Sequence, residues 1–150
     1  MQPKALLSSL VATNDSLAPL FLRLSLGVMA LPHGLQKTFG WFGGHGFTGT
    51  MGYLTEHVGA PWILALLAIL AESVGSVLLL LGFGTRVAAL GLGGVMAVAA
   101  SLHLPHGFFM NWFGNQAGEG VEFHLLALGI VAALLVTGGG KWSIDSRLPR

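Results

Sequence analysis

The sequence contains no cysteine, so disulfide bridges, thiolate metal ligands and thiol redox chemistry are excluded. Charged residues are also scarce, because they make up 9% of the 150 residues against about 25% in a typical soluble domain. Seven basic and six acidic residues give a net charge of +1, which excludes the basic surface that nucleic-acid binding requires. Any redox function must therefore depend on a bound cofactor or on another polypeptide.

Hydrophobic residues make up 53% of the chain and form four long apolar segments, separated by short stretches rich in polar residues, glycine and proline. Each segment is near the ~20 residues that a helix needs to cross a bilayer. In lipid, such a segment is expected to be helical because a helix satisfies its own backbone hydrogen bonds. The sequence therefore predicts an all-α integral membrane protein, a single four-helix bundle with aromatic-rich outer loops over residues 1–150. The predicted spans are about 17–39, 61–81, 86–104 and 120–137.

Basic residues predict the orientation of the bundle. Lys37 falls on one side of the predicted bilayer, and the other six fall on the opposite side: Lys4, Arg23, Arg86, Lys141, Arg147 and Arg150. Since basic residues are enriched in cytoplasmic segments, both termini are predicted to face the cytoplasm. The chain is then a multi-pass protein of the cytoplasmic (inner) membrane, surrounded by the lipid bilayer. Arg23 lies inside the first span, and its side chain is expected to extend toward the inner surface.

Polar and aromatic residues gather on the predicted outer side. All six histidines lie there, as do eleven of the fourteen aromatic residues. An aromatic belt would explain part of this pattern, but a belt should serve both interfaces. The alternative is that the outer loops cover a binding site. Within the first outer loop, a helical spacing of apolar residues predicts a short helix on the membrane surface: Phe47, Met51, Leu54 and Val58.

Glu72 is the acidic residue that the sequence places deepest in the bilayer. It lies eleven residues beyond Pro61, about 16 Å along a helix, which is near the bilayer centre. A carboxylate at that depth is costly and marks a functional site by default, with a polar partner expected. We predict that Glu72 faces the bundle interior, with a polar partner on the first or third span. The alternative is a protonated Glu72 that only holds helices together.

Histidines near the ends of two spans are the other candidate site residues. His33 and Lys37 are four residues apart and share a helix face beside Pro32. For Lys37 alone, the alternative is a side chain that reaches the outer headgroups. His103 and His106 are three residues apart, and neutral imidazoles are suitable ligands for a metal or a haem.

Several short motifs follow one another in a fixed order along residues 17–145. They are His33-Gly34-x-x-Lys37, Glu72-x-x-Gly75, Gly82-Phe83-Gly84-Thr85-Arg86, His103 with the aromatic residues after it, Glu122, and Gly138-Gly139-Gly140 to Ser143-x-Asp145. With these motifs the chain resembles the DoxX family of small four-helix membrane proteins. The resemblance implies a four-helix bundle in the cytoplasmic membrane. It also implies a relation to a subunit of thiosulfate:quinone oxidoreductase and to proteins associated with quinones or oxidative stress.

The leading hypothesis is a subunit of a quinone-linked membrane oxidoreductase. Glu72, His33 and His103 are the predicted catalytic residues, lining one polar cavity in the outer half and exchanging protons with a bound quinone. A membrane or periplasmic redox partner protein would supply the electrons. The predicted quinone-binding residues are a cation and three aromatic side chains that can stack on the ring: Lys37, Phe108, Phe109 and Trp112.

Two alternatives stay open. The first is a haem- or transition-metal-binding protein with His103, His106 and Glu122 as ligands, which would be coloured or would contain stoichiometric metal. The second is a non-enzymatic membrane scaffold or a small-molecule channel. The sequence leaves open the substrate, the electron donor, whether the chain is itself catalytic, and whether it forms a homo-oligomer.

Overall fold

The computed structural model describes residues 10–148, and every secondary-structure element in that range is helical. The all-α class predicted from the sequence is therefore confirmed. The elements in chain order are α2 (Ala18–Phe39), η1 (Trp41–Gly43), α3 (Gly46–Gly52), η2 (Tyr53–His57), α4 (Trp62–Leu81), α5 (Thr85–His103), η3 (Leu104–His106), α6 (Glu122–Thr137) and η4 (Asp145–Arg147).

The long helices begin and end where the sequence supplies helix-breaking residues. Pro19 lies in the first turn of α2, where its missing N–H costs no hydrogen bond, and Pro61 immediately precedes α4. Gly82 ends α4 with φ 65°, a left-handed conformation that glycine adopts without a Cβ clash. The chain then turns back over residues 82–84, so α4 and α5 form an antiparallel hairpin.

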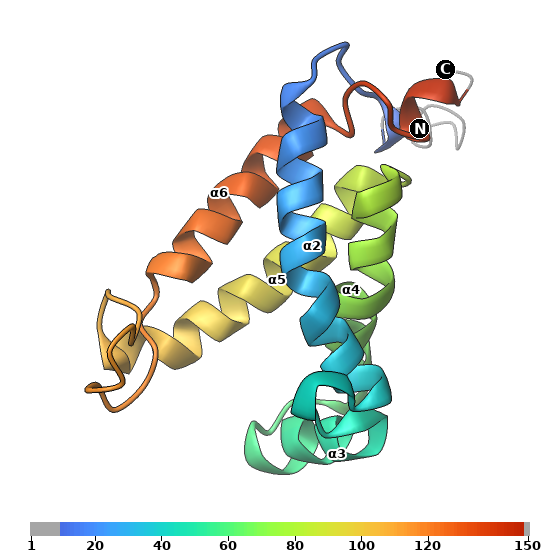
Figure 1. Ribbon diagram of the computed structural model, residues 1–150. Coiled ribbons are helices and arrows are strands. Elements are labelled where there is room, and N and C mark those ends of the chain that lie inside the picture. The colour runs from blue at the N-terminus through green and yellow to red at the C-terminus, as the bar shows by residue number, and fades with distance from the viewer. Residues whose placement is uncertain (1–9, 149–150) are drawn as a thin grey trace.

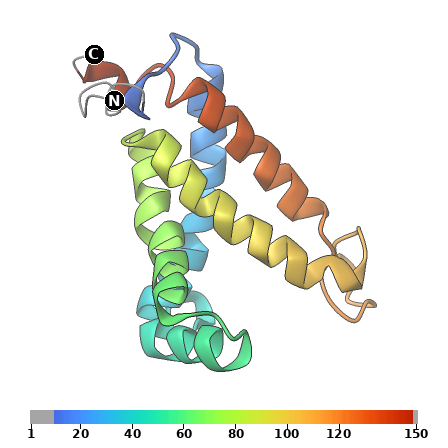
Figure 2. The ribbon, with the colours of Figure 1, turned by 180° about the vertical axis from the view of Figure 1, so that it is seen from behind.

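The four long helices form two pairs that meet at one end of the molecule (Figure 1). α2 packs against α4, α5 packs against α6, and the α4–α5 hairpin joins the pairs. We call the shared end, where the Asn14 N–H bonds to the Thr137 carbonyl, the termini end. At the opposite end, here the loop end, the pairs diverge, and both views show α3 and the α5–α6 loop at separate corners (Figure 2).

The apolar core lies where the two pairs meet. Each long helix contributes a leucine that is at most 1% exposed: Leu26, Leu79, Leu92 and Leu134. Because lipid tails are as apolar as leucine, close van der Waals packing rather than escape from solvent holds such a core together in a membrane.

Arg23 is buried at the termini end, with 2% of its surface exposed. Its guanidinium donates hydrogen bonds to the backbone carbonyls of Leu79, Leu80, Gly139 and Trp142. The last carbonyls of a helix lack intrahelical donors, so Arg23 satisfies the end of α4 and binds the C-terminal segment to it. These carbonyls all lie at the termini end, so the side chain extends in the expected direction, toward the side that the basic residues predict to be the inner surface.

Arg86 and Asp145 complete the termini end. The Arg86 Nε donates a hydrogen bond of 2.8 Å to the Leu135 carbonyl near the end of α6. The Asp145 carboxylate accepts hydrogen bonds from the backbone N–H groups of Gly84 and Thr85, at 2.7 and 2.9 Å, where α5 begins. A cation at a helix C-terminus and a carboxylate at an N-terminus both oppose the charge of the helix dipole. Charged side chains therefore stabilise the helix ends that meet here.

Three described helices are long and apolar enough to cross a membrane, and their bounds agree within two residues with the first three predicted spans. α6 is apolar but has 16 residues, about 24 Å at 1.5 Å per residue, which is shorter than the apolar core of a bilayer. The fourth crossing and the cytoplasmic placement of both termini therefore stay predictions. Lys4 and Arg150, which contribute to the predicted orientation, lie outside the described residues.

Candidate functional site

The ion pair between Lys37 and Glu72 joins α2 to α4. Lys37 lies in the last turn of α2, and Glu72 lies near the middle of α4. The Lys37 Nζ donates a hydrogen bond to the Glu72 Oε2. Glu72 is 4% exposed, whereas 29% of the Lys37 side chain is exposed. The prediction that Glu72 faces the interior and has a polar partner on the first or third span is therefore confirmed.

The pair forms because Gly34 lets α2 approach α4 closely. A Cβ at position 34 would overlap the backbone carbonyl of Glu72 and the Cα of Ser73. Small residues at helix interfaces allow such approach in membranes. Lys37 follows three residues later on the same face of α2, so the contact places its side chain over the carboxylate. Gly34 thus sets the helix separation, and Lys37 supplies the charge.

Two serines flank Glu72 without contacting its carboxylate. The Ser73 Oγ donates to the Ile69 carbonyl at 2.6 Å, and the Ser76 Oγ donates to the Glu72 carbonyl. Each hydroxyl therefore bonds to the backbone one turn earlier, a common pattern for serine within membrane helices. Lys37 is thus the hydrogen-bond partner of the Glu72 carboxylate within the described part of the chain.

A pocket of about 260 Å³ lies beside Lys37, and we call it the pair pocket. Its lining comes from α2, the following loop, α3 and the start of η2: Gln36, Lys37, Gly43, Gly44, His45, Thr50 and Tyr53. The Gln36 Nε2 donates to the Phe42 carbonyl at 3.3 Å and holds the loop against α2. Met51 of α3 packs with Ile69 of α4. The loop and α3 are therefore attached to both helices that carry the ion pair.

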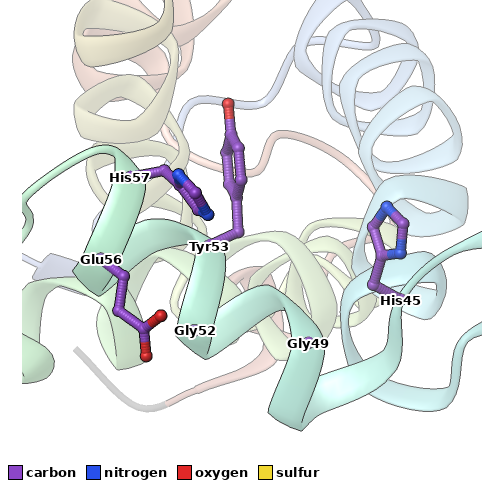
Figure 3. Close-up of a pocket in the computed structure, with 6 residues that line it drawn as sticks. All are labelled: His45, Gly49, Gly52, Tyr53, Glu56 and His57. Atoms are coloured by element: carbon purple, nitrogen blue, oxygen red, sulfur yellow. The ribbon is translucent and has the colours of Figure 1, made fainter.

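A second pocket of about 340 Å³ adjoins the first and is shown in Figure 3; we call it the histidine pocket. Its lining is His45, Gly49, Gly52, Tyr53, Glu56 and His57. In Figure 3 the Tyr53 ring stands between His57 and His45, and the Glu56 side chain is directed away from the ring. The rings of Tyr53 and His57 are 5.7 Å apart. Since His45 and Tyr53 line both pockets, the two pockets are adjacent and share these side chains.

The loop between α2 and α4 contains the short helix that its apolar spacing predicts, as α3 followed by one turn of π-helix, η2. Its location at the membrane surface stays a prediction.

His33 lies next to Gly34 but is exposed. Its side chain forms no hydrogen bond or ion pair with any residue that the structure describes. His33 therefore neighbours the Lys37–Glu72 pair in sequence without taking part in it.

His103 lies on the other helix pair, at the end of α5. Its ring stacks on that of His124 in α6, with centroids 5.0 Å apart, and its Nδ1 is 3.1 Å from the Glu119 carbonyl. The His106 ring is 6.1 Å from that of His103. Because the two helix pairs diverge toward the loop end, the structure groups His103 with these residues and away from the α2–α4 pair (Figures 1 and 2).

The three aromatic residues predicted to bind a quinone lie on the loop between α5 and α6. Phe108, Phe109 and Trp112 are 52%, 67% and 78% exposed. The Glu122 carboxylate accepts a hydrogen bond of 3.0 Å from the Trp112 Nε1, which ties the loop to the start of α6. Lys37, the fourth predicted binding residue, is on the other helix pair, so these residues do not form one surface.

The alternative metal ligands are His103, His106 and Glu122. In residues 10–148, no group of three His, Asp or Glu side chains is arranged to hold a metal ion. Glu122 instead accepts hydrogen bonds from the α5–α6 loop. The metal alternative therefore stays a prediction from the sequence alone.

Sequence reasoning missed the pocket residues Gln36, His45, Thr50 and Tyr53. In the sequence, His45 was one of six histidines on the predicted outer side. Gln36, Thr50 and Tyr53 are uncharged, so their side chains did not identify them as candidate site residues. One available signal was the glycine-rich stretch 40–46, directly after Lys37, because such a stretch can fold back on the helix it follows. Nothing local indicated that α3 would cover the same place.

Comparison with known proteins identifies a family and a curated relative. The DoxX family model matches residues 18–112, which include the ion pair and both pockets. The chain is 34% identical over 116 residues to the inner membrane protein YqjF of Escherichia coli (strain K12), and the match covers 74% of this chain and 81% of that protein. No solved structure matches the chain.

Proposed function

The chain belongs to the DoxX family of membrane proteins, and on that premise we propose that it is a subunit of a quinone-linked oxidoreductase of the inner membrane. The quinone headgroup would bind in the pair pocket, beside Lys37 and Glu72. The observation that carries the proposal is the Lys37–Glu72 ion pair within the predicted spans, because its Lys37 lines a pocket together with the hydrogen-bond donors Gln36 and Thr50.

The lining of the pair pocket suits a quinone headgroup. A quinone presents two carbonyl oxygens, which accept hydrogen bonds. The Lys37 ammonium, the Gln36 amide and the Thr50 hydroxyl are donors in this lining. The volume of the pair pocket, about 260 Å³, is just below the roughly 300–1,000 Å³ that is usual for ligand sites, and the volume of the adjoining histidine pocket, about 340 Å³, is at the low end of that range. A single ring with small substituents matches that size better than a large cofactor such as haem.

The ion pair would supply both orientation and a proton. A bound quinone accepts two electrons and two protons on reduction to the quinol. Lys37 can donate a hydrogen bond to one headgroup oxygen, and Glu72, once protonated, can transfer its proton to a nearby oxygen. Because the chain has no cysteine, we assign the electrons to a reductant carried by a membrane or periplasmic partner protein.

This assignment changes the predicted site. Glu72 and Lys37 stay in it, and Lys37, predicted as a quinone-binding residue, is also the ion-pair partner of Glu72. His103 and the three aromatic residues of the α5–α6 loop are left out because they lie on the other helix pair.

Binding of a short-chain ubiquinone or menaquinone analogue to the purified protein tests the proposal. Lys37→Gln and Glu72→Gln should each weaken binding by about tenfold, the loss expected for one charge-assisted hydrogen bond. Lys141→Gln is the matched control, because Lys141 forms an exposed ion pair with Asp15 at the termini end. Titration calorimetry in detergent measures the dissociation constants.

Two results would contradict the assignment. Equal binding by all three variants and the unchanged protein would remove the ion pair from the site. A loss of binding in His103→Ala that matches the loss in Glu72→Gln would restore the site that the sequence predicts. If neither analogue binds the unchanged protein, the scaffold or channel alternative replaces the oxidoreductase.

A further inference from the structure

We propose that Glu72 exchanges protons with the aqueous phase at the loop end of the molecule, by a route that passes His45 and Tyr53. The inference rests on the proposed function, in which a headgroup beside Lys37 takes up protons. It adds the side of the membrane on which those protons are exchanged. With both termini in the cytoplasm, as the basic residues predict, that side is the outer one.

The two pockets provide the polar part of the route. Lys37 lines the pair pocket, His45 and Tyr53 line both pockets, and the histidine pocket continues to exposed groups in η2. Figure 3 shows His45 and His57 on opposite sides of the Tyr53 ring. The titratable groups along the route are Lys37 of α2, Glu72 of α4, His45 just before α3, and Tyr53, Glu56 and His57 of η2.

The packing on the other side of Glu72 is apolar. Toward the termini end, Leu26 and Ala30 of α2 and Leu79 of α4 are at most 1% exposed and belong to one core cluster. The Ser76 hydroxyl, one turn from Glu72 in this direction, is fully buried and donates to a backbone carbonyl. Within the described residues, the polar groups next to the Glu72 carboxylate therefore lead toward the loop end.

The chemistry of His45 suits this route. A neutral imidazole accepts a proton on one nitrogen and releases another from the second. A proton that enters from water passes by His45 to the Glu72 carboxylate, and Glu72 then donates it to the headgroup oxygen. Afterwards Glu72 is again an anion paired with Lys37. Two such transfers balance the two electrons that the partner reductant supplies.

Single-cysteine variants test the route without any quinone. The chain has no cysteine, so each introduced thiol is measured without background. Thr48→Cys, at an exposed residue of α3, reports which membrane face the loop end occupies. Thr50→Cys places a thiol in the pair pocket, at a residue that is 7% exposed, and Ser76→Cys places one in the core.

A membrane-impermeant methanethiosulfonate reagent is added to spheroplasts and, separately, to inverted membrane vesicles. We expect Thr50→Cys to react from the same side as Thr48→Cys, and Ser76→Cys to react from neither side. A Thr50→Cys thiol that reacts from neither side would overturn the route. So would a Ser76→Cys thiol that reacts from the side opposite Thr48→Cys.

His45→Ala tests the proton transfer itself. We expect quinone-linked turnover to fall about tenfold or more, and by a larger factor than the quinone affinity, which His45 affects only as one of the residues that line the pair pocket. Added imidazoles should restore turnover, at rates that vary with the pKa of the imidazole, as proton transfer requires and space filling does not. Thr48→Ala is the control for a change in the same segment.

Unchanged turnover in His45→Ala, or a loss that imidazoles do not restore, would remove His45 from the route. The two proposals can fail separately. If the protein neither binds nor reduces a quinone analogue, the proposed function fails, and the cysteine experiment still decides whether the Glu72 region opens to the loop end.

Discussion

The charges of Lys37 and Glu72 stabilise each other because the protein shields both groups from part of the water that would surround them on a fully exposed side chain. Removing one member of a buried pair leaves the other charge uncompensated, which costs more than the pair contributes in net terms. Here the cost is moderated on one side, since 29% of the Lys37 side chain is exposed and its ammonium borders the pair pocket. Glu72, with 4% of its surface exposed, has almost no access to water.

This asymmetry gives a prediction for a double-mutant cycle. Lys37→Gln should lower the free energy of unfolding by about 1–3 kcal/mol, because it leaves the buried carboxylate without its donor. Glu72→Gln should cost less, since the remaining ammonium can turn to the pocket. The double variant should lose less than the sum of the two changes. Thermal unfolding in detergent measures all four proteins, and additive losses would show that the charges do not interact.

Among the elements, α2 and α4 are joined most closely at Gly34. The absence of a side chain there brings the two backbones together, and the ion pair forms one turn further along α2. Gly94 of α5 is different, because a Cβ at that position would have no neighbouring atom within 4 Å. Alanine substitutions at these two glycines therefore distinguish the effect of helix packing from the effect of helix propensity.

Gly34→Ala should destabilise the protein by about 1–3 kcal/mol, the usual cost of overfilling a well-packed contact. Gly94→Ala should be neutral or should stabilise by up to about 1 kcal/mol, because alanine loses less backbone freedom than glycine in a helix. Unfolding by heat or by sodium dodecyl sulfate compares the two variants. Equal effects would mean that the α2–α4 contact tolerates a methyl group.

On the scale of the whole molecule, the two ends differ in how they are held. At the termini end, Arg23, Arg86 and Asp145 bind helix ends and bring all four long helices together. At the loop end the helix pairs diverge, so the polar residues form two separate groups (Figure 1). One group surrounds Lys37 and Glu72, and the other contains His103 and His124.

The placement of these ends in the membrane is tested by cysteine labelling. Thr48→Cys at the loop end and Ser146→Cys at the termini end both replace exposed hydroxyl residues. Six basic residues against one predict that an impermeant maleimide labels Thr48→Cys in spheroplasts and Ser146→Cys in inverted vesicles. Labelling of Ser146→Cys from outside would reverse the orientation. Labelling of both from one face of intact cells would mean that the number of crossings between them is even.

The sequence by itself determined where the helices lie and where along α4 Glu72 is found. Apolar segments of sufficient length predict the first three long helices to within two residues, and α2 and α4 also have proline at their starts and glycine at their ends. The interior position of Glu72 also follows locally, because a carboxylate in the middle of an apolar helix is costly unless it has a partner. These features depend on residues that are close together in the chain.

Only the tertiary structure decided which side chains meet. Lys37 and Glu72 are 35 residues apart, and His103 stacks on His124 rather than approaching Glu72. Position along a helix follows from 1.5 Å per residue, but the angle and separation between helices follow from packing across several of them. Two contacts are examples of such packing between helices: Gly34 lies against α4, and Gly93 lies against Val131 of α6. Each contact holds one helix pair together, and the divergence of the two pairs toward the loop end separates Glu72 from His103, which the sequence places on the same side of the bilayer.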